Sequence, residues 1–133
     1  MEFLPERLEE YVNDHTSPEN DVLSELNRQT HLKVLQPRML SGHLQGRVLS
    51  MMSKMVQPQR ILEIGTYTGY AALCLAEGLR DHGELITIDV NYELEDMVKS
   101  YIDKAGFSDK INLKIGDALE IIPQLDRSFD IVF

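Results

Sequence analysis

The sequence predicts an α/β fold with a parallel β-sheet, preceded by an all-helical segment. From residue 60 onward, short apolar runs alternate with helix-forming stretches of about 10 to 15 residues, which is typical of βαβ units. Before that point, apolar residues recur at helical spacing. The chain has 133 residues, enough to bury one core. We expect a helical extension over residues 1–57, packed on the ligand side, and a sheet-forming half over residues 58–133.

The N-terminal segment is expected to form three helices, the first over Glu6 to Asn13. The second is expected to begin at Ser17-Pro18-Glu19, where serine suits the cap, proline the first helical position and an acid the helix dipole. It ends at Gln36-Pro37, because the residue before a proline disfavours helical geometry. The third is expected over Gly42 to Val56, with a packing face made of Leu44, Val48, Leu49, Met52 and Met55.

The second half is expected to hold four strands separated by helices. The strands, rich in apolar residues, are Arg60–Ile64, Glu84–Ile88, Ile111–Ile115 and Phe129–Phe133. The helices between them are Tyr70–Leu79, Tyr92–Ala105 and Ala118–Ile122. The fourth strand runs to the last residue with no turn after it, so we expect the C-terminal strands of the sheet to be missing. The fourth strand would then be an apolar edge, which invites pairing with another chain.

A glycine loop follows the first strand, where Ile61 to Gly69 reads Ile-Leu-Glu-Ile-Gly-Thr-Tyr-Thr-Gly. Glycines there let the backbone turn sharply and approach a ligand. The spacing Gly65-x-x-x-Gly69 does not fit the dinucleotide fingerprint Gly-x-Gly-x-x-Gly, and no Lys-Ser/Thr follows, as a P-loop requires. Glu63 stands just before the first glycine. A carboxylate there would repel a pyrophosphate and suits a ligand with an ammonium or sulfonium charge.

A carboxylate lies at the tip of the second strand, where the run from Leu85 to Ile88 ends in Asp89. In that position it can accept hydrogen bonds from both hydroxyls of a ribose. Val90 would cover one face of an adenine, and Gly116-Asp117-Ala118, after the third strand, would lie at the adenine edge. Two structural alternatives stay open: the glycines as ordinary turn residues, and Asp89 as a helix N-cap.

Composition narrows the expected partners and compartment. The net charge of −9 repels phosphate backbones, so we expect no nucleic-acid partner. No apolar run approaches the roughly 20 residues of a membrane span, and the acidic start lacks the basic residues of a signal peptide. The single cysteine, Cys74, fits a reducing compartment and a place in the core. We therefore expect a cytoplasmic protein with no membrane partner.

These residues together resemble the S-adenosylmethionine-dependent O-methyltransferases of the catechol and caffeoyl-CoA type. The resemblance covers Ile61 to Phe133 and extends through Met39 to Gly46, which is similar to bacterial members. It implies the Rossmann-like fold of class I methyltransferases, with S-adenosyl-L-methionine as the cofactor. With the loop analysis, it predicts these cofactor-binding residues: Met39, Ser41, Glu63, Gly65, Thr66, Tyr67, Gly69, Tyr70, Ala71, Asp89, Val90, Gly116, Asp117 and Ala118.

The resemblance also assigns parts of the cofactor to parts of this set. The positions near the methionine part are Glu63 and Gly65, and the positions that line the same loop are Tyr67, Tyr70 and Ala71. The ribose is assigned to Asp89 and the adenine to Asp117 and Ala118, while Met39 and Ser41 match positions that close over the cofactor. Ala71 stands where the family often has a serine, which weakens one contact to the cofactor carboxylate without removing the site.

The implied chemistry is methylation of a hydroxyl on a small catechol-like acceptor. In the family, a divalent cation such as Mg²⁺ chelates two adjacent acceptor oxygens and lowers a hydroxyl pKa. Its first ligand follows the fourth strand, so we expect the metal ligands beyond residue 133 and assign no catalytic or metal-binding residue within the chain. A homodimer or self-association through the open edge is expected. Two alternatives stay open: a tRNA wobble hydroxyuridine O-methyltransferase, and a truncated, catalytically incomplete module that binds the cofactor.

Overall fold

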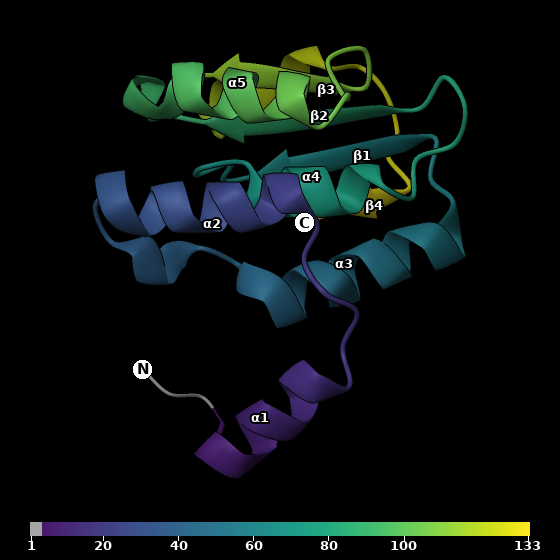
Figure 1. The fold of residues 1–133 in the computed structure, drawn as a ribbon. Coiled ribbons are helices and arrows are strands. Elements are labelled where there is room, and N and C mark those ends of the chain that lie inside the picture. The colour runs from purple at the N-terminus through teal and green to yellow at the C-terminus, as the bar shows by residue number, and fades with distance from the viewer. Residues whose placement is uncertain (1–3) are drawn as a thin grey trace.

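The computed structural model describes residues 4–133 and has the predicted α/β architecture with a parallel sheet (Figure 1). Residues 1–3, the start of the predicted helical extension, lie outside the described part. The strands are β1 (Arg60–Ile64), β2 (Glu84–Asp89), β3 (Ile111–Ile115) and β4 (Ile131–Val132). They form one parallel sheet in the order β3-β2-β1-β4, as expected for a Rossmann-like fold.

Helices precede the sheet and alternate with its strands. The α-helices are α1 (Glu6–Asp14), α2 (Asp21–Lys33), α3 (Gly42–Val56), α4 (Tyr70–Ala76), α5 (Glu95–Lys104) and α6 (Ala118–Ile121). The described residues also form three short 3₁₀ turns: η1 (Pro37–Met39) before α3, η2 (Tyr92–Leu94) before α5 and η3 (Ile122–Gln124) after α6. The segment from β1 to β3 therefore alternates strands with helices, as the sequence predicts.

Both faces of the sheet are covered, which explains why its central strands are apolar throughout. On one face, Ile61 and Leu85 pack in a core shared with α2, α3, α4 and α5. On the other, Leu62, Ile86 and Ile88 pack against α6, η3 and the segment that follows. The helices of the N-terminal segment thus share a core with the sheet. The predicted boundary between the helical extension (residues 1–57) and the sheet-forming half (residues 58–133) stays a prediction.

The predicted start of the second helix is wrong. The helix begins at Asp21, and the side chain of Asn20, not that of Ser17, accepts a hydrogen bond from the Leu23 N–H at 2.9 Å. Asparagine is as good a cap as serine. Glu19, just before it, accepts a hydrogen bond from the Tyr70 hydroxyl at 2.6 Å instead of starting the helix. The third helix has the predicted bounds, whereas α4 ends at Ala76, earlier than expected.

The predicted packing face of α3 is correct only at Leu49. Its buried residues are Gly46, Leu49, Ser50 and Ser53, whereas the other predicted packing residues, Leu44, Val48, Met52 and Met55, are exposed. The cause is the close approach of α3 to α4. A Cβ atom built on Gly46 would lie 2.7 Å from the Tyr70 ring, and one on Gly78 would lie 2.2 Å from the Ser53 backbone. Only small side chains fit where α3 approaches α4 most closely, so the large apolar side chains of α3 other than Leu49 are exposed.

Candidate functional site

A cavity of about 600 Å³ opens beyond the carboxyl ends of β1 and β2. Four predicted site residues line it: Met39, Gly65, Tyr67 and Asp89. The size suits a small-molecule ligand. The position, at the carboxyl ends of parallel strands, is where open α/β sheets bind ligands.

The loop after β1 is held open by residues with left-handed backbone geometry. Gly65 has φ +101°, Tyr67 +51° and Gly69 +91°. A Cβ atom built on Gly65 would meet nothing within 4 Å, so this glycine presents bare backbone to the cavity. The Gly65 N–H donates to the Ile88 carbonyl at 2.8 Å, which ties the loop to the end of β2. The glycines are therefore required by the conformation of a ligand-lining loop.

Asp89 joins the two loops at the cavity. Its Oδ2 accepts from the Tyr67 N–H at 2.8 Å, and its Oδ1 accepts from the Asn91 N–H at 2.9 Å. The next helical turn, η2, is capped by the side chain of Asn91, which accepts from the Glu93 N–H at 3.0 Å. The alternative of Asp89 as a helix N-cap is therefore wrong. Each carboxylate oxygen has about two acceptor sites, so both retain capacity for a ligand hydroxyl.

Glu63 lies behind the loop rather than in the cavity. Its side chain is fully buried in β1 and accepts a hydrogen bond from the Thr87 hydroxyl. Because Thr87 donates its proton to Glu63, the Thr66 hydroxyl, 2.5 Å away, donates to Thr87. Burial raises the pKa of Glu63 to about 8, so the carboxyl is largely neutral at neutral pH. It braces the loop through the two threonines, and its predicted contact with a cofactor stays a prediction.

Other predicted loop residues turn their side chains into the core. Thr66, Tyr70 and Ala71 are at most 7% exposed, so any contact they make with a ligand runs through backbone atoms. Cys74 is buried in the same helix, and burial raises its thiol pKa to about 12, as suits the predicted core role.

The residues assigned to the adenine surround the tip of β3, next to the cavity. Gly116 donates its N–H to the Asp89 carbonyl at 2.8 Å, so the two strand ends are in contact. Asp117 caps α6 by accepting from the Leu119 N–H at 2.8 Å. Val90 is exposed, and Ser41 and Ala118 are half-buried. Neither these residues nor Gly69 line the cavity itself.

Sequence reasoning missed the outer wall of the cavity. That wall comes from the end of α2 and from η2, through Lys33, Val34, Leu35, Gln36, Asn91, Glu93 and Leu94. The Tyr67 hydroxyl donates to the carbonyls of Leu35 and Gln36 at 3.1 and 3.2 Å, which fixes this segment over the glycine loop. The sequence signal for this wall was Gln36-Pro37. The break before the proline ends the helix, and the residues just before it form the wall.

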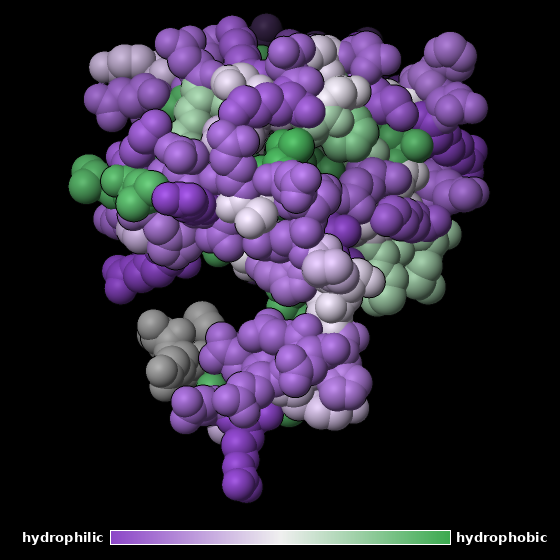
Figure 2. All heavy atoms as spheres, viewed as in Figure 1, coloured by the Kyte–Doolittle hydropathy of each residue, from purple (hydrophilic) through white to green (hydrophobic). Residues whose placement is uncertain are grey.

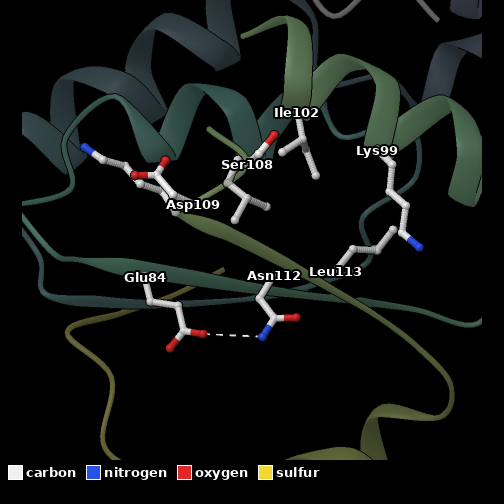
Figure 3. Close-up of a pocket in the computed structure, with 9 residues that line it drawn as sticks. Glu84, Lys99, Ile102, Ser108, Asp109, Asn112 and Leu113 are labelled. Atoms are coloured by element: carbon white, nitrogen blue, oxygen red, sulfur yellow. Dashed lines mark hydrogen bonds between the residues drawn. The ribbon is translucent and has the colours of Figure 1, made fainter. Parts of the chain in front are cut away.

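A second cavity, of about 460 Å³, lies between β3 and α5 (Figure 3). Its lining includes Glu84 and Ile111, the first residues of β2 and β3, so it lies toward the amino ends of these strands. Figure 3 shows Glu84 accepting a hydrogen bond from Asn112 at 3.4 Å. No glycine loop borders it, so it lacks the backbone access that the first cavity has.

The fold is that of a Rossmann-like α/β protein with a cavity beyond the carboxyl ends of β1 and β2. A family model described as O-methyltransferase matches residues 13–133. The chain therefore belongs to the O-methyltransferase family. Within the described part, no helix is long and apolar enough to cross a membrane.

Among curated proteins, the chain is similar to caffeoyl-CoA O-methyltransferase 1 of Eucalyptus globulus, with 37% identity over 94 residues. That match covers 67% of this chain and 38% of the relative. It is also similar to the catechol O-methyltransferase of Niastella koreensis, with 28% identity over 96% of this chain and 59% of the relative. The chain thus spans between 38% and 59% of the length of these relatives.

Solved structures give the same family. The Podospora anserina methyltransferase PaMTH1, in an SAH-bound crystal structure, matches with a TM-score of 0.89 and 28% identity over 100% of this chain and 60% of its own. The O-methyltransferase TomG of Streptomyces achromogenes, in complex with SAM, matches with a TM-score of 0.87 and 32% identity over 96% of this chain and 58% of its own.

Proposed function

We propose that this chain binds S-adenosylmethionine in the cavity beyond β1 and β2, and that the protein methylates a hydroxyl of a small catechol-like acceptor. The observation that carries the proposal is the Asp89 carboxylate at the tip of β2, beside the bare backbone of Gly65. The SAH-bound and SAM-bound relatives support the choice of cofactor. The caffeoyl-CoA and catechol enzymes among the relatives support the choice of acceptor.

The described residues fit this cofactor by the shape of the cavity and by its hydrogen-bond acceptors. Asp89 would accept hydrogen bonds from the ribose hydroxyls. Gly65 leaves room where a side chain would fill the cavity, and Met39, 60% exposed, would cover the ligand from the η1 side. When bound, S-adenosylmethionine supplies a methyl group on a sulfonium sulfur. The chain's own part in these 133 residues is to bind and orient that group.

A divalent metal belongs to the same proposal, but its ligands are expected outside this part of the protein. Residues 4–133 contain no group of three or more His, Cys, Asp or Glu side chains placed to hold a metal ion. Cofactor binding is assigned to this chain and methyl transfer to the whole protein.

The binding proposal is tested by titrating the chain with S-adenosylhomocysteine in a calorimeter, with NAD as the control ligand. We expect binding of S-adenosylhomocysteine alone. Asp89→Ala should weaken it on the order of 100-fold, because hydrogen bonds to a charged acceptor contribute about 1.5 to 3 kcal/mol each. Asp89→Asn keeps one acceptor oxygen and should lie between the two. Equal affinity in all three proteins, each folded by circular dichroism, would remove Asp89 from the site.

The acceptor is tested separately, with the whole protein. Methyl transfer from labelled cofactor should appear with a catechol and Mg²⁺, and it should be lost with a chelator. Transfer to tRNA instead would replace the small-molecule acceptor by a wobble uridine, which the net charge of −9 disfavours.

A further inference from the structure

The connection between α2 and α3 forms a strap, residues 34–40, along one side of the cavity beyond β1 and β2. Figure 1 shows the chain passing from α2 to α3 on the side to which the arrows of β1 and β2 point. Four residues of the strap line the cavity: Val34, Leu35, Gln36 and Met39. Leu35 is 88% exposed and Met39 is 60% exposed, and Figure 2 shows apolar side chains projecting on the side where α2 ends. A segment that buries so little opens more readily than the core.

The chain is fixed to the core on both sides of the strap. Before it, at the end of α2, the Thr30 hydroxyl is hydrogen-bonded to the Thr68 hydroxyl of the glycine loop at 3.1 Å, and both side chains are fully buried. After it, Leu40 packs against the main core. Between these two points, Gln36 has φ +57°. Left-handed geometry is costly for a residue other than glycine, so surrounding contacts must hold Gln36 in it.

The Tyr67 hydroxyl supplies that contact. It donates to the carbonyl of Leu35 at 3.1 Å and to the carbonyl of Gln36 at 3.2 Å. Within residues 4–133, these are the hydrogen bonds that join the strap to the glycine loop, and the backbone bonds of the strap close its own turns. Desolvation raises the pKa of the Tyr67 hydroxyl, so it keeps its proton and remains a donor.

The backbone of Tyr67 is held at the other end, by the carboxylate assigned to the ribose. Its N–H donates to Asp89 Oδ2 at 2.8 Å, and its own φ is +51°. Asp89 therefore fixes the point from which the Tyr67 side chain extends to the strap. The carboxylate at the tip of β2 and the strap beside the cavity are thus connected through one residue.

We propose that Tyr67 is a positioning residue whose hydroxyl holds the strap closed over the bound cofactor and so sets how long the cofactor stays. While the hydroxyl is bonded, Met39 stays at the cavity. When the bond breaks, the strap moves away between its two fixed ends and the ligand can leave. The inference rests on the proposed function, because it takes the ligand of this cavity to be S-adenosylmethionine or S-adenosylhomocysteine. The hydroxyl acts on the protein, not on the ligand.

Limited trypsin digestion measures opening of the strap, because Arg38 is exposed within it. Tyr67→Phe keeps the ring and loses the hydroxyl, so cleavage after Arg38 in the free chain should be about three- to tenfold faster, the range for one net hydrogen bond. S-adenosylhomocysteine should slow this cleavage in the wild-type chain and slow it less in the variant. Equal cleavage after Arg38 in the two free chains would overturn the proposal.

Two controls separate opening of the strap from general loss of stability. Arg127, exposed ahead of β4, is an internal reference, and cleavage after it should be equal in all the proteins. Tyr92→Phe removes the hydroxyl of a tyrosine that is 73% exposed and should behave as wild type at both sites. Faster cleavage of Tyr67→Phe after Arg127 as well as after Arg38 would mean that the hydroxyl stabilises the whole fold, and it would overturn the specific role.

The dissociation rate of S-adenosylhomocysteine, measured by stopped flow, tests the effect on the ligand. Tyr67→Phe should release it about three- to tenfold faster, with association no slower than in wild type, because an open strap does not hinder entry. Tyr92→Phe should keep the wild-type rates. If the wild-type chain binds S-adenosylhomocysteine and Tyr67→Phe keeps its dissociation rate, the role of Tyr67 is overturned and the proposed function stands. If the wild-type chain does not bind it, the proposed function fails and this role fails with it.

Discussion

Glu63→Gln should remove a large pH dependence of stability, because Glu63 is a fully buried carboxyl. Burial is the main cause that raises its pKa to about 8. The hydrogen bond from Thr87 opposes the rise, and the charge of Asp89 adds to it. Between the ordinary value of 4.5 and about 8, the folded chain holds a proton that the unfolded chain releases. This contribution to stability is fully present below the lower value and is lost as the pH rises through the higher one.

The size of the effect follows from the same two values. One pKa unit corresponds to about 1.4 kcal/mol. Between about pH 5.5 and pH 7.5, both inside the window, the wild-type free energy of unfolding should therefore fall by about 3 kcal/mol from this group. Glutamine cannot titrate and still accepts the hydrogen bond from Thr87, so the variant should lack this fall.

Urea unfolding at these two pH values measures the difference, and comparison of the two proteins cancels the contribution of the histidines. Glu120→Gln, which removes an exposed carboxyl, is the matched control and should keep the wild-type slope. If wild type and Glu63→Gln show equal slopes, the carboxyl is ionised at neutral pH. The proposal that a neutral Glu63 carboxyl supports the loop through Thr87 and Thr66 would then be refuted.

Three further substitutions test the loop, the helix contact and the sheet edge. Gly65→Val places a β-branched residue at φ +101° and fills the cavity; it should cost about 1 to 3 kcal/mol of stability and abolish S-adenosylhomocysteine binding, and retained affinity would contradict the loop assignment. Gly78→Ala puts a Cβ atom 2.2 Å from the Ser53 backbone; it should lower the melting temperature markedly, and an unchanged melting curve would mean that α3 and α4 are not in close contact. Val132→Lys charges the edge strand β4, where Val132 is 63% exposed; it should reduce any association through that edge in sedimentation, and association unaffected by it would place the contact elsewhere.

Much of the sheet and its ligand loop is predictable from local sequence. The strand bounds Arg60–Ile64 and Ile111–Ile115 agree with the structure. Strands buried on both faces are continuous apolar runs that end at turn residues. Gly65 and Asp89 were found for a related reason, since left-handed geometry and an acid at a strand tip leave a residue-type signature.

What the sequence did not reveal depends on contacts between distant segments. The pattern of α3 contains two candidate faces, one apolar and one of small residues. Only the closeness of α4 decides that the small face is buried. The burial of Glu63 likewise depends on Thr87, 24 residues away. The wall from Lys33 to Gln36 becomes part of the cavity through the Tyr67 hydroxyl, 31 and 32 residues further along the chain.

The glycine loop is organised by hydrogen bonds that do not involve a ligand. On the cavity side, Asp89 accepts a hydrogen bond from the Tyr67 N–H. On the buried side, the Thr66 hydroxyl is hydrogen-bonded to Thr87, which in turn donates to Glu63. A loop fixed in this way loses little conformational entropy when a ligand binds, so more of the interaction energy appears as affinity. It also means that Asp89 acts twice, as a loop anchor and as a proposed ribose acceptor. The Asp89→Asn variant separates these roles: if one remaining oxygen preserves the loop while affinity falls, the lost binding belongs to the ribose contact rather than to the loop.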